Sequence, residues 1–150
     1  MSKLGRLFVK IFKMEKKKIL LIDDDVDFLA ELAEMLKLSG YEPACVSDAS
    51  RALSVALDMD PDVILLDLKM FGLNGFQLAD RFSQNELLKN IPIIAMSGHF
   101  IHDKHNMLMG LYGINYFLEK PFDSFGAIIK IETALAGAEK KGIMIRKDRR

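Results

Sequence analysis

The chain alternates short apolar runs of β type with helical patterns, and this alternation restricts the folds that are open to it. Five apolar runs are expected to form strands, at residues 18–22, 42–46, 63–66, 91–96 and 115–118. Helical patterns follow them, at residues 26–38, 48–57, 76–88, 101–111 and 123–135. Strands that alternate with helices pack as a parallel sheet with helices on both faces. Uninterrupted runs such as Ile19-Leu-Leu-Ile22 favour this class, because strands buried on both sides lose their polar alternation.

Polar side chains follow the apolar runs at the positions where the strands are expected to end. Asp23 and Asp24 follow the first run, and Asp67 follows the third. Ser97 follows the fourth run, and Lys120 follows the fifth. Right-handed crossovers bring the carboxyl ends of parallel strands to one edge of the sheet, where open α/β sheets bind ligands. We therefore expect these five side chains to meet in one pocket.

Three converging carboxylates would repel one another, and a bound cation relieves that repulsion. An all-oxygen ligand set favours Mg²⁺, with Mn²⁺ as the alternative, over zinc or copper. Lys120 adds a second positive charge, and Ser97 adds a hydroxyl donor. Two cations and a hydroxyl around a carboxylate suit the binding of a tetrahedral anion, and a phosphoryl group fits this set best.

From about Lys18 to Leu135 the sequence resembles the receiver domain of two-component response regulators, which is a CheY-like domain. The resemblance rests on Ile19-Leu-Leu-Ile-Asp23-Asp24-Asp25, Pro61-Asp62-Val-Ile-Leu-Leu-Asp67-Leu-Lys-Met70, Gly72-Leu-Asn-Gly75, Ile91-Pro-Ile-Ile-Ala-Met-Ser97 and Phe117-Leu-Glu-Lys120-Pro121-Phe122. It implies a flavodoxin-like, doubly wound α/β fold. Such a fold has a five-stranded parallel sheet in the order 2-1-3-4-5 and five helices.

The resemblance also implies roles for the matching residues. Asp67 would be the phosphoacceptor, whose carboxylate attacks the phosphorus of a phosphohistidine to give an aspartyl phosphate. Asp24 and Asp67 would hold Mg²⁺ directly, with Asp23 acting mainly through water. The backbone carbonyl of Lys69 would complete the protein ligands, and Lys120 would pair with the phosphoryl oxygens.

Two further residues would form a switch in a domain of this kind. Ser97 would move towards the phosphate, and Phe117 would rotate inward with it. Burial of Phe117 as plain core is the competing interpretation. The switch would reshape the surface that downstream partners read, as a population shift biased by one covalent charge.

We expect a stand-alone receiver, because no effector sequence is recognised after Leu135. The resemblance implies that it takes its phosphoryl group from a sensor histidine kinase or a histidine phosphotransfer protein. Self-phosphorylation and self-dephosphorylation would be its only chemistry, so we do not expect an enzyme in the turnover sense. Two alternatives stay open. One is a Mg²⁺-dependent phosphohydrolase with an aspartate nucleophile, although Lys69 stands where such enzymes carry a second Asp. The other is a phosphorylation-independent binding module that keeps the receiver fold.

The net charge of zero hides an uneven distribution. Residues 1–18 hold seven Lys/Arg and one Glu, and residues 138–150 hold six Lys/Arg and two acids. The stretch between them holds eight Lys/Arg and eighteen acids. We expect a basic amphipathic extension at residues 1–17, a receiver domain at 18–137 and a basic, solvated tail at 138–150. That tail is too short for a DNA-binding domain, so no direct nucleic-acid binding is expected.

Leu4, Leu7 and Ile11 recur at helical spacing among basic residues, which is typical of a helix that lies on an anionic membrane or packs on a partner. Residues 1–13 are therefore candidates for contact with a membrane surface or a protein, and a dimer is one arrangement to test. An added helix that packs on the domain itself is a further alternative, as is a start codon assigned too early.

No apolar run approaches the ~20 residues that a spanning helix needs. A cytoplasmic location is expected, with a peripheral membrane location as the variant.

Overall fold

A five-stranded parallel sheet in the order β2-β1-β3-β4-β5 forms the centre of the molecule, as expected. In this computed structural model the described residues are 2–12, 15–70, 74–98 and 102–148. Gly72, which carries part of the receiver resemblance, lies outside them. The strands are β1 (Lys18–Ile22), β2 (Glu42–Val46), β3 (Val63–Asp67), β4 (Ile93–Ser97) and β5 (Tyr116–Glu119). The helices are α1 (Lys3–Phe12), α2 (Val26–Leu38), η1 (Ala49–Arg51), α3 (Ala52–Met59), α4 (Gly75–Ser83), α5 (His102–Leu111) and α6 (Ser124–Asp148).

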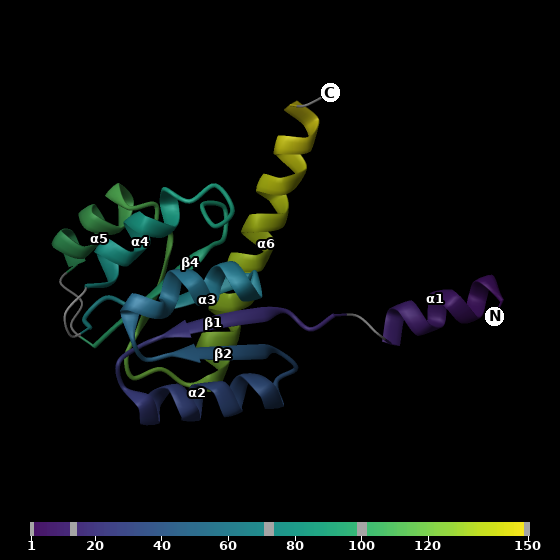
Figure 1. Ribbon diagram of the computed structural model, residues 1–150, viewed down its shortest axis with the longest axis horizontal. Coiled ribbons are helices and arrows are strands. Elements are labelled where there is room, and N and C mark those ends of the chain that lie inside the picture. The colour runs from purple at the N-terminus through teal and green to yellow at the C-terminus, as the bar shows by residue number, and fades with distance from the viewer. Residues whose placement is uncertain (1, 13–14, 71–73, 99–101, 149–150) are drawn as a thin grey trace.

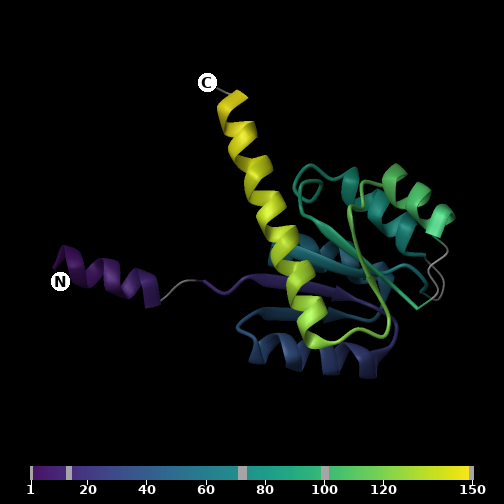
Figure 2. The same cartoon turned by 180° about the vertical axis from the view of Figure 1, so that it is seen from behind.

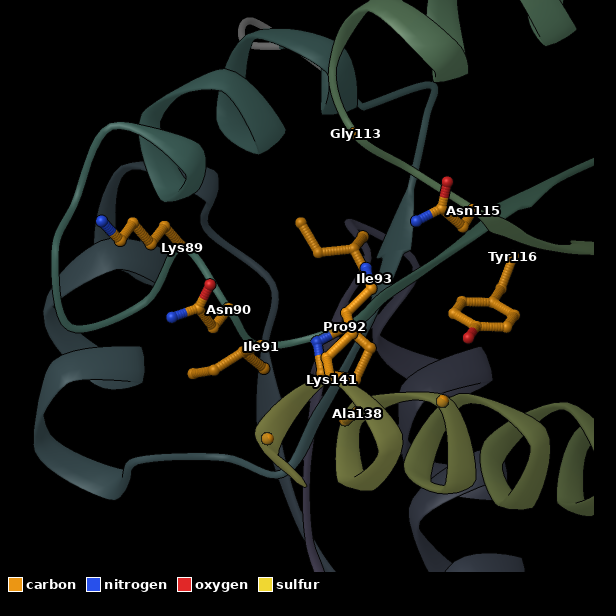
Figure 3. Close-up of a pocket in the computed structure, with 12 residues that line it drawn as sticks. Lys89, Asn90, Ile91, Pro92, Ile93, Gly113, Asn115, Tyr116, Ala138 and Lys141 are labelled. Carbon is orange, nitrogen blue, oxygen red and sulfur yellow. The ribbon is translucent and has the colours of Figure 1, made fainter. Parts of the chain in front are cut away.

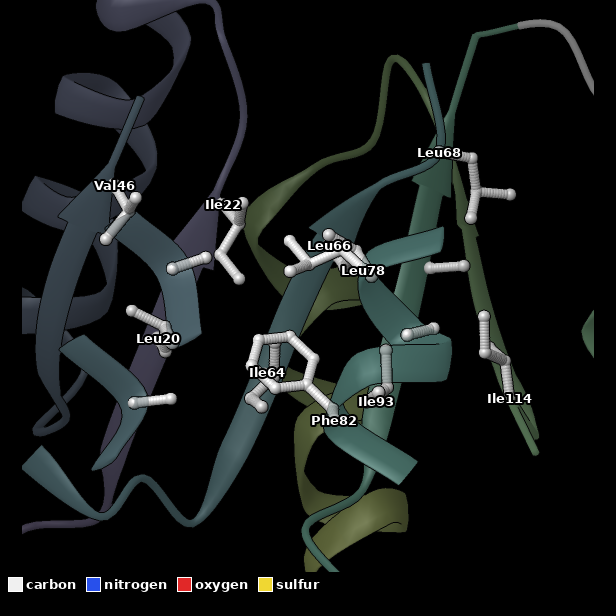
Figure 4. Packing of buried hydrophobic residues seen from close by; sticks show 14 of the residues in the cluster. Leu20, Ile22, Val46, Ile64, Leu66, Leu68, Leu78, Phe82, Ile93 and Ile114 are labelled. Atoms are coloured by element: carbon white, nitrogen blue, oxygen red, sulfur yellow. The ribbon is translucent and has the colours of Figure 1, made fainter. Parts of the chain in front are cut away.

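Helices cover both faces of the sheet, and Figures 1 and 2 show this arrangement from opposite sides. Leu20, Ile64 and Leu66 point to the face covered by α3, α4 and α5 (Figure 4). Leu21 and Leu65 point to the other face, where α2 and α6 pack. Because successive side chains of a strand point to opposite faces, two-sided covering requires every residue of a central strand to be apolar. This explains the uninterrupted apolar runs.

Local polar contacts determine where two of the helices begin. The Asp25 side chain accepts a hydrogen bond from the Phe28 backbone N–H at 3.0 Å, which caps α2. Asn74 caps α4 in the same way, because its side chain accepts from the Gln77 backbone N–H. The Gln77 side chain in turn accepts from the Asn74 backbone N–H, which completes a capping box. Both helices therefore begin directly after loops at the carboxyl edge of the sheet.

Several element boundaries differ from the sequence prediction. α4 ends at Ser83, not Leu88, because the Asn85 side chain accepts from the Leu87 backbone N–H at 2.9 Å and forms a turn. β4 starts two residues later than expected, at Ile93. Pro92, which has no N–H to donate, instead accepts from the Ile64 backbone N–H. β5 is displaced by one residue and ends at Glu119.

The last helix is much longer than predicted. We expected a helix that ends at Leu135 and a solvated tail from residue 138, but α6 continues unbroken to Asp148 and projects beyond the sheet (Figure 1). Most of its added residues are good helix formers, so isolated glycines do not stop it. At Gly137 the missing side chain has a packing reason, because a Cβ there would collide with the Tyr116 hydroxyl.

The N-terminal segment forms a helix, as its spacing predicted. α1 lies beyond the edge where the strands begin, apart from the layers around the sheet in both views (Figures 1 and 2). Leu4 is 75% exposed and Leu7 is 54% exposed. In the part of the chain that the structure describes, no helix combines the length and hydropathy needed to cross a bilayer.

Candidate metal and phosphoryl site

Three carboxylates from two separate strands meet at the carboxyl edge of the sheet. Asp23 and Asp24 follow β1, and Asp67 is the last residue of β3. One oxygen from each of the three side chains lies within 4.8 Å of the others. Asp23 and Asp67 are buried and Asp24 is exposed, so the cluster opens to solvent on one side. This arrangement of oxygen ligands fits a small, hard cation that keeps water in its remaining positions.

Lys120 reaches the same cluster from the end of β5. Its Nζ lies 2.5 Å from Asp23 Oδ2 and 3.9 Å from Asp67 Oδ2. The backbone of Lys120 also contacts the end of β4, because the Lys120 N–H donates to the Ser97 carbonyl at 2.8 Å. The ammonium group therefore offsets part of the negative charge in the metal-free site, and it stands beside the carboxylate expected to receive a phosphoryl group.

Asp67 is electrostatically unusual. Burial, followed by the charges of Asp23 and Asp24, raises its pKa from 3.8 to about 6. The Lys69 backbone N–H, 3.2 Å from Asp67 Oδ1, and the charge of Lys120 act in the opposite direction. Burial and like charge thus prevail over the two stabilising groups. A buried carboxylate with a raised pKa, in a cluster that opens to solvent, is typical of a functional site.

The start of α4 packs closely against the backbone at the end of β3. A Cβ added at Gly75 would lie 2.7 Å from the Leu68 Cα, a distance that real contacts do not show. The Gly75 N–H also donates to the Leu68 carbonyl at 3.1 Å. Glycine is therefore required where α4 begins against the end of β3, directly beside Leu68.

The two expected switch residues lie on neighbouring strands, β4 and β5, in different surroundings. Ser97 ends β4 and is 4% exposed. Phe117 in β5 is half-buried and packs against the cluster of apolar side chains beneath α3, α4 and α5. The structure therefore places Phe117 at the border of the core, a position compatible with both interpretations given above.

One aromatic residue at the site was not foreseen. Lys120 Nζ lies 4.2 Å from the centre of the Phe28 ring, and Phe28 meets Phe122 edge to face with ring centres 5.8 Å apart. The ring is placed to attract the ammonium group and to limit its movement. Nothing in the local sequence around Phe28 indicates this contact, because it depends on how α2 packs beside the end of β5.

A second hollow, of about 240 Å³, lies at the opposite edge of the sheet, between α6 and the loops that precede β4 and β5 (Figure 3). It is lined by Lys89, Asn90, Ile91, Pro92, Ile93, Gly113, Asn115, Tyr116, Gly137, Ala138, Lys141 and Gly142. None of these lining residues is acidic. Among the described residues, the acidic group that could hold a metal ion is the one at the carboxyl edge.

An open parallel sheet in this order, with an acidic cluster and a lysine at its carboxyl edge, is the arrangement of the CheY-like fold. The family model of the response regulator receiver domain matches residues 19–131. The chain therefore belongs to the receiver family of two-component systems. Receiver domains are signalling modules that interact with histidine kinases and downstream effectors, and they are not enzymes in the usual sense.

Curated relatives match the same region. The phosphate regulon transcriptional regulatory protein PhoB of Pseudomonas aeruginosa is 32% identical over 81% of this chain and 53% of its own length. The transcriptional regulatory protein PrrA of Mycobacterium bovis is 31% identical over 79% of this chain and 49% of its own length. The chain thus spans about half the length of these relatives.

Solved structures show the same fold. NtrX from Brucella abortus, in a structure with ADP, superposes with a TM-score of 0.80 at 29% identity, over 91% of this chain and 30% of NtrX. The chemotaxis protein CheY4 of Vibrio cholerae gives a TM-score of 0.77 at 23% identity, over 81% of this chain and all of CheY4. At that identity the second likeness concerns the fold alone.

Proposed function

We propose that Asp67 accepts a phosphoryl group from a phosphohistidine of a sensor histidine kinase or a histidine phosphotransfer protein. The observation that carries this proposal is the meeting of Asp23, Asp24 and Asp67 within 4.8 Å, with Lys120 Nζ 3.9 Å from Asp67 Oδ2. Three carboxylates alone would suit a structural cation. The added ammonium group suits a site that must also hold phosphoryl oxygens.

The transfer is an in-line displacement at phosphorus. A carboxylate oxygen of Asp67 forms the new O–P bond, and the P–N bond to the donor imidazole breaks with its electron pair returning to that nitrogen. Lys120 pairs with a phosphoryl oxygen and reduces the charge that develops there. The Lys69 N–H, which donates to Asp67 Oδ1, orients the carboxylate and leaves Oδ2 on the side of Lys120.

Mg²⁺ is the proposed cofactor, with Mn²⁺ as the substitute. Asp24, Asp67 and the Lys69 backbone carbonyl would hold it, with Asp23 contributing through water. A bound Mg²⁺ would neutralise charge on the carboxylates and on the phosphoryl oxygens. The oxygen-only donor set and the raised pKa of Asp67 both fit a divalent ion, since such an ion relieves the like-charge contact.

The proposed output is a change in the partner-binding surface. Ser97 and Phe117 would move when Asp67 carries a phosphoryl group, and that movement would favour one of two surface states. One relative, MtrA of Mycobacterium tuberculosis, is named a DNA-binding response regulator and matches over 51% of its own length. This name stands against the expectation of no direct nucleic-acid binding, although this chain matches only about half of that relative. We place the domain in the cytoplasm, where histidine kinases would meet it.

Treatment with acetyl phosphate and MgCl₂, followed by intact mass spectrometry, tests the proposal. The full chain should gain the mass of one phosphoryl group, and Asp67→Asn should not. Asp25→Asn is the matched control, because Asp25 lies beside the cluster but caps α2, a role that asparagine also fills. Equal modification of wild type and Asp67→Asn would refute the assignment. Multiple turnover on a phosphomonoester would instead support the phosphohydrolase alternative.

A further inference from the structure

Two surfaces of the molecule are unpartnered and complementary. The first is the side of α1 that carries Leu4 and Leu7, which are 75% and 54% exposed. Lys3 and Arg6 line the same patch, and within the described residues neither makes an ion pair. Such a helix face is complementary to an apolar surface with a negative rim.

The second surface is a shallow, open groove of about 740 Å³ along α2, and Ser124 at the start of α6 also lines it. Met35 and Leu38 form its apolar part, and Leu38 is 82% exposed. Glu31 and Glu34 form its acidic part, and neither makes an ion pair within the described residues. A smaller hollow of about 180 Å³ shares Glu31 and Met35 with the groove and extends the apolar floor to Phe122.

The dimensions of the two surfaces agree. α1 has 10 residues, which corresponds to a length of about 15 Å at 1.5 Å per residue. Two rows of α2 side chains line the groove, from Ala30 to Leu38 and from Glu31 to Ser39, so the groove follows roughly 12 Å of helix. A short amphipathic helix laid in a helical groove is an established mode of recognition, in which neighbouring leucines act as anchors.

We propose that α1 of one copy of this chain docks in the α2 groove of a second copy. Leu4 and Leu7 would contact Met35 and Leu38, and the cations of α1 would face Glu31 and Glu34. Reciprocal exchange of the two α1 helices closes a symmetric dimer and doubles the buried area. A second copy is favoured as the occupant because it supplies both matching halves, apolar against apolar and cationic against anionic. A bilayer would leave the acidic groove without a partner.

Light scattering coupled to gel filtration tests the association with the full chain. Wild type should elute at twice the 17.0 kDa of one chain. The double variants Leu4→Glu/Leu7→Glu, Lys3→Glu/Arg6→Glu and Glu31→Lys/Glu34→Lys should each elute as monomers. Combining the two charge reversals in one chain should restore the dimer. Leu87→Glu, at a residue that is 77% exposed and outside the groove, is the matched control and should remain dimeric.

Disulfide trapping between mixed variants tests whether α1 docks in the α2 groove of a second chain or of its own chain. In a Cys45→Ser background, Leu4→Cys mixed with Leu38→Cys should give a cross-linked dimer, whereas Leu4→Cys mixed with Leu87→Cys should not. A monomeric wild type would overturn the proposal. So would a Leu4→Cys/Leu38→Cys double variant that closes only within one chain. Binding of a monomeric chain to phosphatidylglycerol vesicles, lost in Leu4→Glu/Leu7→Glu, would assign α1 to a lipid surface instead.

Discussion

At the scale of single residues, the buried carboxylate of Asp67 is a source of instability that the proposed function requires. Its pKa is raised to about 6 by burial and by the neighbouring carboxylates, so the folded state binds a proton more tightly than the unfolded state does. The free energy of unfolding should therefore fall as the pH rises from about 4 to about 6, and the loss is complete above that window. The charge that costs stability is the one that the proposed role of Asp67 as a nucleophile requires.

This leads to a prediction for Asp67→Asn in metal-free protein. At pH 7 the variant should be more stable than wild type by on the order of 1 kcal/mol, because one of the clustered charges is removed. At pH 4 the two proteins should have nearly the same stability. Urea denaturation at both pH values, with chelator present, measures the difference. An advantage that does not depend on pH would contradict the electrostatic explanation.

Lys120 gives a second prediction at this scale. Lys120→Met should destabilise the metal-free protein by roughly 1–3 kcal/mol, because Asp23 is left buried without its 2.5 Å partner. Adding Asp23→Asn should recover a large part of the loss. A double-mutant cycle in urea measures the coupling between the two residues. A coupling energy near zero would show that the ion pair does not contribute to stability.

At the scale of elements, contacts between elements decide which glycines are replaceable. Gly75→Ala should destabilise the protein by about 2 kcal/mol or more, because the added Cβ meets backbone atoms of β3 and the residue that follows it. Gly110→Ala, in α5, should be neutral or stabilising by up to ~1 kcal/mol, since nothing lies within 4 Å of the added carbon. Thermal unfolding of the two variants compares them directly. Phosphorylation by acetyl phosphate should fall in Gly75→Ala and stay unchanged in Gly110→Ala.

The strand and helix boundaries show where local sequence is sufficient. The ranges expected for β1, α2 and β2 match the structure, because an uninterrupted apolar run, the Asp25 cap and the turn at Gly40 each act within a few residues. The predicted end of α4 was wrong by five residues. The helix gives way to a turn in which the Asn85 side chain accepts from the Leu87 N–H, and asparagine at this position does not by itself exclude a helix. α6 was predicted to end at Leu135 but continues to Asp148, because most residues of the added stretch are good helix formers.

At the scale of the whole molecule, metal binding should report on the assembled site. Mg²⁺ at ten times its dissociation constant should stabilise the folded state by about 1.4 kcal/mol, if the unfolded chain does not bind it. For a chain of this size, each kcal/mol corresponds to a shift of roughly 2–4 °C in Tm. Asp24→Asn should reduce the shift, and Asp25→Asn should retain it. No shift in wild type with either Mg²⁺ or Mn²⁺ would argue against the proposed cofactor.

The sequence by itself determined the fold class, the strand order through the receiver resemblance, and the residues that meet at the carboxyl edge. It could do so because apolar periodicity is local and because parallel topology brings every strand end to one edge. Only the tertiary structure decided the contacts between distant segments: the Phe28 ring beside Lys120, the fit of Gly75 against β3, and the pairing of Lys120 with Asp23 at 2.5 Å. Such contacts depend on how helices pack on the sheet, and packing is a property of shape that no single segment of the chain contains.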